Sequence, residues 1–497
     1  MATLAMIFCG QSWAQMSSTI TGTVTDPSGA VIPDANVTAT QDETGEKRTT
    51  VTNGDGIYQI SGLGVGHYSL TVTASGFTSY KTTGIVVNAA QTYREDAHLT
   101  VGGNNQTVTV QANALALQTE TNEVSTLISG QQVREIATNG RNITSLTTLG
   151  AGVSSNIPSF NGVTAQNSTA TISFNGLRPD HNNFLIDGGE VYDRGSGGKL
   201  DVLPSPDAIG QFQVLSSNYA PDYGISSGGT VLVELRSGSQ HFHGGLWEFN
   251  RNDDYDADYY FAKQNHTATP ELRLNIFGGN IGGPVWIPHL YNDSKQKTFF
   301  FVNEEWRKYI AGVNPSVTPT IPANDFPTAG AAFTYTPFNG TAVPVVPVTT
   351  DPAKLAIYTA DHLTPGQPFP GNTIPANLLD PNAVLFMGTG AIPMPNSGTD
   401  NYVASPKQPT YVREDVVRID HNISDKYHLM GSWIHDAMSQ TLIPTQWSGD
   451  SYDTVGDVFA NPSWGAAIRL TQSISPTVLN ETGLYVNGNT ISVSPYG

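Results

Sequence analysis

The sequence predicts a mainly β chain, and three observations support this fold class. Charged residues make up only 13% of the 497 residues, about half of the ~25% usual in soluble domains. Glycine and proline, with 50 and 31 residues, favour short strands and turns over helices. From residue 243 onward, apolar and polar side chains alternate along segments of about 8–12 residues, close to the length of a membrane-spanning strand. This alternation predicts an incomplete antiparallel transmembrane β-barrel.

The composition also excludes some classes of function. The net charge is −19 and only 23 residues are Lys or Arg, so we expect no nucleic-acid partner, because phosphate binding needs a basic surface. Cys9 is the single cysteine, which excludes an internal disulfide and a thiolate metal site. Residues 1–14, MATLAMIFCGQSWA, have the apolar core and small residues of a signal peptide. No later apolar run reaches the 18 or so residues of a spanning helix.

Residues 17–101 contain about seven short strands separated by turns, a pattern that predicts a β-sandwich. Asp26–Gly29 and Asn53–Gly56 have the residues expected of tight turns. The segments ITGTVTDPSGAVIPDANVT and TNGDGIYQISGLGVGHYSLTVTASGF resemble the carboxypeptidase-regulatory-like domain. That resemblance implies a transthyretin-like sandwich, and it does not imply peptidase activity.

Residues 102–119 are expected to form a linker that begins with GGNNQ. The alternating run that follows is compatible with the last strand of a sheet. Alternatively, QTVTVQA resembles a TonB box, the extended segment through which TonB-dependent receptors pair with a periplasmic energy transducer. Main-chain hydrogen bonds to a sheet edge suit such a segment. The candidate residues are Gln106, Thr107, Val108, Thr109, Val110, Gln111 and Ala112.

Residues 120–240 resemble the α+β plug domain of the same receptors. The resemblance rests on GQQVREIATNGRNITSLTTLGAGV and ISFNGLRPDHNNFLIDGGEVYD. Ser129–Leu149 is the best candidate for a pair of helices, with Val133, Ile136 and Ala137 on one face and an interruption at Asn139–Gly140. The plug motif residues are Arg141, Asn175, Gly176, Arg178, Asp187 and Gly188, and the charged ones are expected to pair with barrel charges.

Residues 243–497 contain seven amphipathic segments, which are expected to be the first barrel strands. They are HGGLWEFNRN, ELRLNIFGG, Phe299–Arg307, Tyr411–His421, Tyr427–Asp436, Trp464–Ile474 and Val478–Gly488. Long gaps (Arg251–Pro270, Lys308–Thr410, Ala437–Ser463) alternate with short ones (Gly278–Thr298, Asn422–Lys426, Ser475–Thr477). Outer-membrane barrels have long external loops and short periplasmic turns, so the alternation predicts the orientation.

The same region resembles the opening barrel strands of Oar-like TonB-dependent receptors through SGSQHFHGGLWEFNRN, FGGNIGGPV, KTFFFVNEEWR and SPTVLNETGLYVNG. We expect lipid-facing or interfacial positions for Trp247, Phe249, Phe299, Phe300 and Trp306, and alternation places Leu272, Leu274 and Ile276 on one face. Seven strands are too few to close around a folded plug, because even a barrel of about eight strands has room only for side chains. The sequence is therefore expected to be an N-terminal fragment of a longer receptor.

The chain shows no convincing catalytic or metal-binding motif. Gly224–Gly228 matches G-x-S-x-G, but a strand rather than a helix is expected to follow, unlike a nucleophile elbow. Asp254, Asp256 and Asp258 begin like a calcium loop, without its later Gly and Glu. His241 and His243 lack further ligands at metal-binding spacing. We expect no catalytic residue, no cofactor and no metal.

The resemblances together imply an outer-membrane receptor that binds an external ligand and gates its uptake by plug displacement. Its implied partners are a TonB-type energy transducer, outer-membrane lipid and an unidentified ligand contacted by the long loop 308–410. The sandwich would lie in the periplasm. The alternative is an exported surface adhesin or carbohydrate-binding protein acting through the N-terminal sandwich, which a soluble secreted form would indicate.

Overall fold

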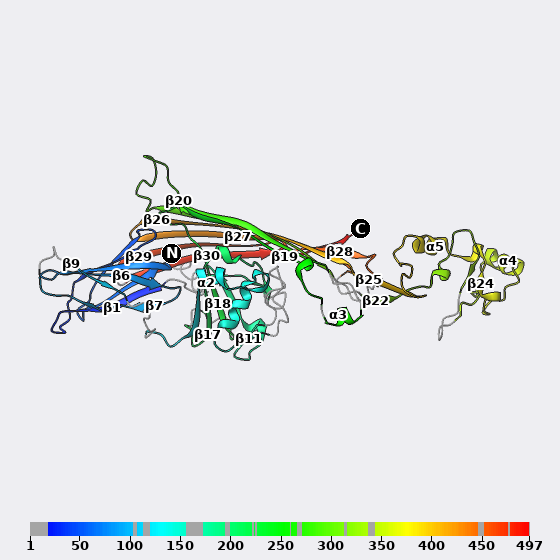
Figure 1. The fold of residues 1–497 in the computed structure, drawn as a ribbon, viewed down its shortest axis with the longest axis horizontal. Coiled ribbons are helices and arrows are strands. Elements are labelled where there is room, and N and C mark those ends of the chain that lie inside the picture. The colour runs from blue at the N-terminus through cyan, green and yellow to red at the C-terminus, as the bar shows by residue number, and fades with distance from the viewer. Residues whose placement is uncertain are drawn as a thin grey trace, which may run out of the picture.

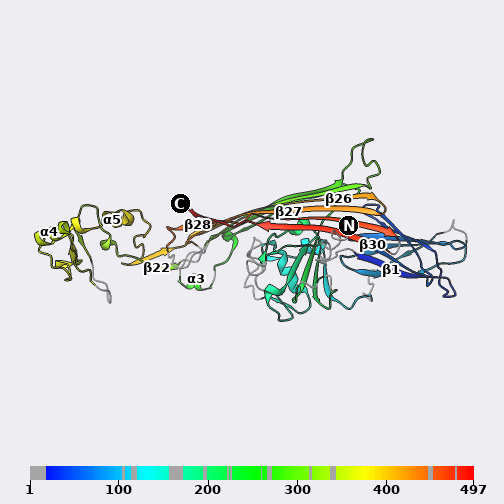
Figure 2. The same cartoon turned by 180° about the vertical axis from the view of Figure 1, so that it is seen from behind.

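The computed structural model has three parts arranged around one long sheet (Figures 1 and 2). It describes residues 18–102, 107–112, 120–155, 172–193, 199–220, 223, 226–258, 260–265, 271–312, 316–335, 343–445, 452–475 and 478–496. The predicted signal peptide lies outside these residues. A first unit (residues 18–112) lies at one end of the long sheet, a middle unit (residues 124–235) covers one face, and a loop unit (residues 316–404) extends beyond the other end.

The first unit consists of two small sheets that share an apolar core. In one sheet, β1 (Ser18–Thr25) lies between β4 (Ile57–Leu63) and the short strands β7 (Thr92–Arg94) and β8 (Ala97–His98). The other has the order β3-β2-β5-β6-β9, with bounds Lys47–Val51, Asn36–Gln41, Gly66–Thr73, Ser79–Val87 and Thr107–Gln111. Every second residue of β1 is buried. This alternation turns one face of each sheet toward the shared core.

The middle unit is built on a five-stranded sheet of order β10-β17-β18-β13-β14. The bounds are Val124–Ser129, Ile209–Ser217, Thr230–Leu235, Asn183–Ile186 and Gly189–Glu190, and the shorter elements are β11 (Val153–Ser155), β12 (Ile172–Phe174), β15 (Tyr192–Asp193), β16 (Lys199–Leu200), η1 (Asn139–Arg141), η4 (Pro179–His181) and η5 (Pro206–Ala208). Strands β17 and β18 are buried along almost their whole length. One side of this sheet packs on the long sheet, so continuous burial replaces the alternation of buried and exposed residues.

The segment 129–149 contains two short helices with an interruption at Gly140, as the sequence predicted. A capping box at Ser129 starts α2 (Gly130–Glu135), and η2 (Ile143–Leu149) follows Gly140, whose φ of 64° breaks the helix. The expectation of one shared apolar face was wrong. Val133 is buried, whereas Ile136 is 38% exposed because the helix has already ended there.

The long sheet contains nine antiparallel strands, of which seven correspond to the predicted segments. These seven are β19 (His243–Asn252), β20 (Leu272–Pro284), β21 (Thr298–Gly312), β26 (Lys407–Ser424), β27 (Tyr427–Leu442), β29 (Ser463–Ser475) and β30 (Val478–Asn489). Two short strands, β28 (Gly456–Ala460) and β31 (Ser492–Tyr496), add to the far end. Five of the seven have 13–18 residues and exceed the predicted length, whereas β19 and β30 have 10 and 12 residues. Within the described residues the sheet is open, with β19 at one edge.

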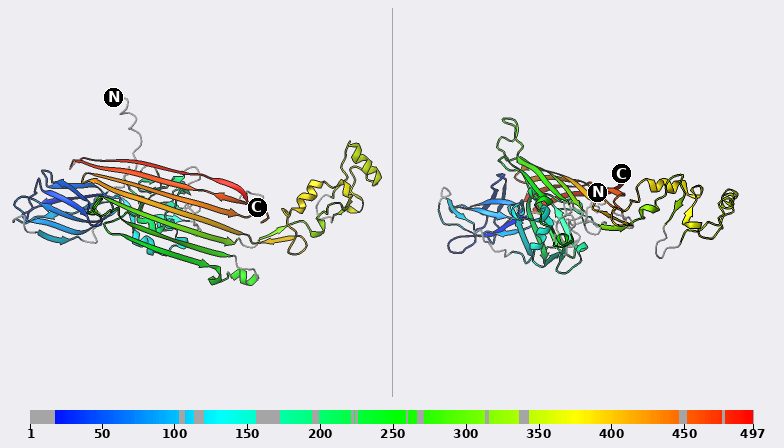
Figure 3. Two further views of the ribbon diagram at one scale, coloured as in Figure 1. Left: turned by 90° about the horizontal axis from the view of Figure 1, so that it is seen from above. Right: turned by 45° about the vertical axis from the view of Figure 1, so that its right-hand side comes forward.

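The connections alternate in length as the sequence predicted. Segments 285–297 and 425–426 connect strands at the end near the first unit, whereas 253–271 and 313–406 lie at the opposite end (Figures 1 and 3). The segment 253–271 contains η7 (Asp253–Tyr255) and α3 (Tyr260–Asn265). Among the described helices, none is long and apolar enough to cross a membrane.

The loop unit has a small core of its own. Val346, Tyr358, Leu363 and Phe369 are its buried apolar residues. Its elements are β22 (Ser316–Pro319), η8 (Ala323–Asp325), β23 (Phe333–Thr334), α4 (Pro352–Ala360), η9 (Pro370–Asn372), β24 (Thr373–Ile374), η10 (Ala376–Leu378), α5 (Pro381–Gly388) and β25 (Asn401–Ala404). Both α-helices begin with an Asp N-cap followed by Pro, a strong start signal. The described residues of the predicted loop 308–410 therefore include folded elements.

The face of the long sheet that contacts the middle unit is called its inner face. Several aromatic residues that the sequence predicted to face lipid lie on this inner face. Trp247 donates a hydrogen bond to the fully buried Glu305 (2.9 Å), and Phe249 lies 4.1 Å beneath the guanidinium of Arg141. Phe299 is 1% exposed. The lipid-facing or interfacial assignment of these three aromatic residues was wrong.

A comparison of residues on the two faces of the sheet shows why the assignment was wrong. Phe277 and Trp306 stack at 5.5 Å on the outer face, whereas Leu274 and Ile276 lie on the inner face and are buried. Strand alternation gives the period of two but not the side that each row faces. The inner face here packs against folded protein, which also attracts apolar side chains.

Candidate functional site

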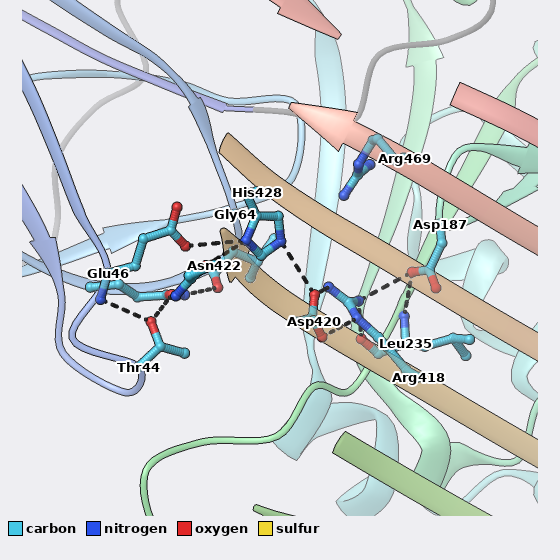
Figure 4. Close-up of polar contacts among 12 residues, drawn as sticks. Thr44, Glu46, Gly64, Asp187, Leu235, Arg418, Asp420, Asn422, His428 and Arg469 are labelled. Carbon is cyan, nitrogen blue, oxygen red and sulfur yellow. Dashed lines mark hydrogen bonds and ion pairs between the residues drawn. The ribbon is translucent and has the colours of Figure 1, made fainter. Parts of the chain in front are cut away.

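The contact between the long sheet and the middle unit contains a buried arginine, Arg418 of β26 (Figure 4). Its Nε and Nη2 donate to the two carboxylate oxygens of Asp420 at 3.0 and 3.1 Å. Nη1 reaches across to the middle unit, where it meets the carbonyl of Leu235 at 2.8 Å, Asp187 at 3.3 Å and Glu234 at 3.5 Å. Arg418 is 5% exposed. One cation therefore holds three carboxylates in a buried site.

A tight turn of the middle unit positions Asp187. Asp187 and Gly188 connect β13 to β14 with φ values of 50° and 92°, the left-handed conformation that Asp-Gly turns adopt. Asp187 also accepts a hydrogen bond from the Leu235 amide at 3.0 Å. A Cβ on Gly188 would lie 2.9 Å from the hydroxyl of Tyr485 on β30. The turn therefore approaches the long sheet too closely for a larger residue.

A second buried cluster surrounds Arg307 of β21. Its Nε pairs with Glu305 at 2.8 Å, and its Nη2 pairs with Glu414 at 2.9 Å. The same Nη2 donates to the carbonyl of Leu203 in the middle unit at 3.2 Å, while Asp436 of β27 accepts from the Leu203 amide at 2.8 Å. Both carboxylates of the ion pairs are fully buried. The cluster thus fixes the backbone of the middle unit to two strands of the sheet.

Arg141 of the middle unit extends this cluster. It pairs with Asp207 within its own unit and lies 3.7 Å from Glu305 of the sheet. Nearby, Asn303 donates to the Ser205 hydroxyl at 3.1 Å and to Glu414 at 3.1 Å. Both the middle unit and the long sheet therefore contribute charged side chains to this contact, and the arginines pair with carboxylates.

Apolar contacts lie beside the ion pairs. Phe301, Val416 and Ile434 of the long sheet belong to the same buried cluster as the core of the middle unit. The burial of apolar area supplies the favourable free energy of such a contact. Buried ion pairs contribute little net stability but impose a large penalty when one partner is lost. The ion pairs therefore determine how the middle unit is positioned on the long sheet, while apolar burial supplies much of the stability of the contact.

A line of polar contacts continues from Arg418 to the first unit (Figure 4). His428 of β27 lies 3.5 Å from Asp420 and 3.6 Å from Glu46 of the first unit. Gln240, which follows the middle unit, donates through its backbone amide to the carbonyl of Glu43 at 3.0 Å. A cavity of about 50 Å³ lies at this meeting point of the three parts. The first unit is thus docked on the sheet and does not hang free.

Burial also perturbs acids of the middle unit. Burial, followed by the like charge of Asp193, raises the pKa of Asp201 to about 6. The Asn489 amide of β30 donates to both carboxylates, at 3.0 Å to Asp201 and 3.1 Å to Asp193. Burial likewise raises the pKa of Glu234, and the nearby Arg418 opposes that shift.

Family comparison agrees with this architecture. Residues 234–495, more than half of the chain, match the family described as the outer membrane beta barrel domain. The chain belongs to this family. Residues 19–100 also match the carboxypeptidase regulatory-like domain, which confirms the resemblance seen in the sequence. The barrel-family match places the chain in the outer membrane.

One curated relative is the TonB-dependent transporter Oar of Myxococcus xanthus, 26% identical over 330 residues. The match covers 63% of this chain and 28% of that relative, so the chain spans less than a third of its length. The solved structures include the Escherichia coli outer membrane transporter YddB, with 11% identity, a TM-score of 0.44, and 72% of this chain and 38% of that chain covered. The ferric enterobactin receptor PfeA of Pseudomonas aeruginosa is 9% identical, with a TM-score of 0.35, and the match covers 74% of this chain and 46% of that chain.

Within this barrel-family chain, the predicted plug motif residues separate into two groups. Arg141 and Asp187 reach charges of the long sheet, and Gly188 lies against it. Asn175 and Gly176 instead form another turn with φ values of 52° and 78°, and Asn175 donates to the carbonyl of Ser216. Arg178 is exposed at the start of η4. Gln106 lies outside the described residues. The other TonB-box candidates form β9 and the adjoining Ala112.

The partners on the long sheet were missed in the sequence. Glu305 and Arg307 on β21, like Glu414, Arg418 and Asp420 on β26, occur at even spacing and so share one strand face. Charged residues in membrane-spanning segments normally face the protein interior. The even spacing of these charged residues along each strand could have identified the inner face from the sequence. Among the described residues there is no cluster of three or more metal-ligating side chains.

Proposed function

We propose that this chain forms the front part of a TonB-dependent outer-membrane transporter, in which the middle unit is the plug and the long sheet is part of the barrel wall. The supporting observation is the buried, charge-paired contact between Arg418 and Arg307 on the sheet and the Asp187 turn and Leu203 segment of the middle unit. A permanent domain interface is usually more apolar at its centre. A plug needs a seated position of defined register that applied force can still disrupt.

The orientation follows from the two ends of the long sheet. Short connections and the first unit share one end, and long connections with the loop unit lie at the other. In outer-membrane barrels the short turns face the periplasm. We therefore place the first unit in the periplasm, lipid around the outer face of the sheet, and an external ligand at the loop unit and the apex of the plug.

The energy for transport would come from a TonB-type transducer that binds the segment containing β9. Pulling on this segment loads β10, because β10 follows β9 in the chain. Strand β10 is the edge strand of the middle unit's sheet and pairs only with β17 among the described strands. An edge strand can be peeled away one pair at a time, so force applied here loosens the plug from one side.

Cysteine labelling in living cells tests this proposal. Ser205 is fully buried against Asn303 of the long sheet, so Ser205→Cys in the chain expressed from its own locus should resist a small maleimide when the plug is seated. We expect labelling in energised cells that contain the transducer and ligand, and its loss after a protonophore. Thr148→Cys, at an exposed position of the same unit, is the control that labels in both states. Equal labelling of Ser205→Cys with and without energy would refute plug displacement.

A further inference from the structure

Strand β9 is bonded to the first unit and is not a free tether. It pairs in parallel with β6 over five residues, from Ser79↔Thr107 to Thr83↔Gln111. The register continues into Ala112, whose amide donates to the carbonyl of Thr83 at 2.9 Å. Strand β9 is also the last strand in the sheet order β3-β2-β5-β6-β9. The TonB-box candidate therefore forms one edge of the first unit.

The backbone of β9 has a defined outer side. The Ala112 amide points toward β6, and backbone groups alternate in direction along a strand. Val108 and Val110 therefore direct their amides toward β6, whereas Thr109 and Gln111 direct theirs outward. Among the described residues, no strand pairs with that outer side. Val108 and Val110 are 45% and 40% exposed, so the strand is open to a partner.

We propose that the first unit presents β9 to the energy transducer, whose own strand adds to the outer edge of β9 while β9 remains paired with β6. This inference rests on the proposed function and specifies how its periplasmic partner binds. An exposed edge offers main-chain donors and acceptors, which an extended segment of another protein satisfies by strand addition. Adding to the outer edge breaks no existing pair, whereas capturing β9 alone would first break its ladder with β6.

One consequence distinguishes this arrangement from a free tether. When the transducer pulls, the first unit moves with β9, so its docking contacts must separate before force reaches β10. These contacts include the Gln240 amide with Glu43 and the approach of His428 to Glu46. The line of contacts in Figure 4 joins the same docked region to Arg418. Release of the first unit and loosening of the plug would therefore be coupled.

A disulfide lock tests whether β9 stays on β6. Lys81 and Thr109 are register partners, and neighbouring strands are close enough for a disulfide, so Lys81→Cys with Thr109→Cys should tie the strands together. The full chain would be tested for binding to the purified periplasmic domain of a TonB-type transducer from the same bacterium. We expect the oxidised and reduced forms to bind within about twofold of each other. A tenfold loss on oxidation that reduction reverses would overturn the proposal.

A matched pair of substitutions tests the outer edge. Thr109→Pro removes an outward amide and should weaken binding at least tenfold, whereas Thr109→Ala keeps the amide and should bind like the unmodified chain. Equal binding by both variants would overturn strand addition at this edge. Failure of the proposed function has a different signature, since the unmodified chain would then not bind the transducer domain or would bind equally well without residues 107–111.

Discussion

Replacing Arg418 with methionine should loosen the middle unit from the long sheet more than any change at an exposed arginine. The guanidinium is 5% exposed and lies within 3.5 Å of the carboxylates of Asp187, Glu234 and Asp420. Arg418→Met leaves these acids without their shared cation. Removing one partner from a buried ion pair costs about 3–5 kcal/mol. Even the lower value corresponds to an increase of about 100-fold in the open population, since ~1.4 kcal/mol is a factor of ten.

Hydrogen exchange of the membrane-inserted chain measures this opening. The Leu235 amide is bonded to Asp187, so it reports directly on the site and should exchange about 100-fold faster in Arg418→Met. Arg413→Met is the matched control on the same strand. Arg413 is 54% exposed, and its ion pairs join it to Glu304 and Asp415 of the long sheet and not to the middle unit. Its loss should leave Leu235 protected.

A double-mutant cycle decides whether the two sides of the contact act together. Asp187→Asn combined with Arg418→Met should show a coupling of about 1 kcal/mol or more, because contacting charged partners are not independent. Additive effects would contradict the assigned contact. Faster exchange throughout β1 of the first unit would also contradict it, because that would indicate general unfolding and not local release of the middle unit.

Three further changes test other parts of the same contact. Gly188→Ala should destabilise the middle unit by about 1–3 kcal/mol in urea denaturation, because its φ is 92° and a Cβ would lie 2.9 Å from the Tyr485 hydroxyl; Tyr485→Phe should relieve only the clash, and full recovery would contradict the strain. Asp201 has a pKa of about 6 in the folded chain against an ordinary 3.8, so the folded state binds more protons between these values. The contribution of Asp201 to the stability of the folded chain is full below pH 4 and is lost as the pH rises through 6, a change of about 1–2 kcal/mol after solvent screening. Asp201→Asn should remove this dependence of stability on pH. An unchanged pH profile of stability in that variant would refute the prediction. Trp247→Phe removes the hydrogen-bond donor to the buried Glu305 (2.9 Å). The loss should lower stability by about 1.5–3 kcal/mol and so lower the midpoint of thermal unfolding. An unchanged midpoint would contradict the inward position of Trp247.

Local sequence patterns predicted much of the fold because they depend on short-range chemistry. The alternation of residues such as Glu271 to Asn275 identified a strand, and the Asp187-Gly188 pair indicated a tight turn. Loop lengths then gave the order of long and short connections. Each of these inferences uses residues within a few positions of each other, where strand period and turn conformation are determined by neighbouring groups.

The contacts that unite the parts could not be predicted in this way. Arg418 and Asp187 are 231 positions apart, and no local pattern pairs them. The inward position of Trp247 was missed for a related reason, since its hydrogen bond to Glu305 joins two strands that are not neighbours in the sheet. The TonB-box candidate was interpreted as a tethered segment in preference to the last strand of a sheet, because its place before the plug-like residues is local information and its pairing with β6 is not.

The distribution of charge determines how the contact between the long sheet and the middle unit resists separation. Phe301, Val416 and Ile434 lie among the core of the middle unit, and apolar contacts of this kind weaken gradually as surfaces separate. The ion pairs of Arg307 and Arg418 are different, because a charge that leaves its partner inside protein is penalised until water reaches it. Separation is therefore unfavourable at small displacements and easier once the site is wet. A plug with this contact would resist thermal leakage yet yield to a sustained pull, which is the mechanical behaviour that force-driven transport requires.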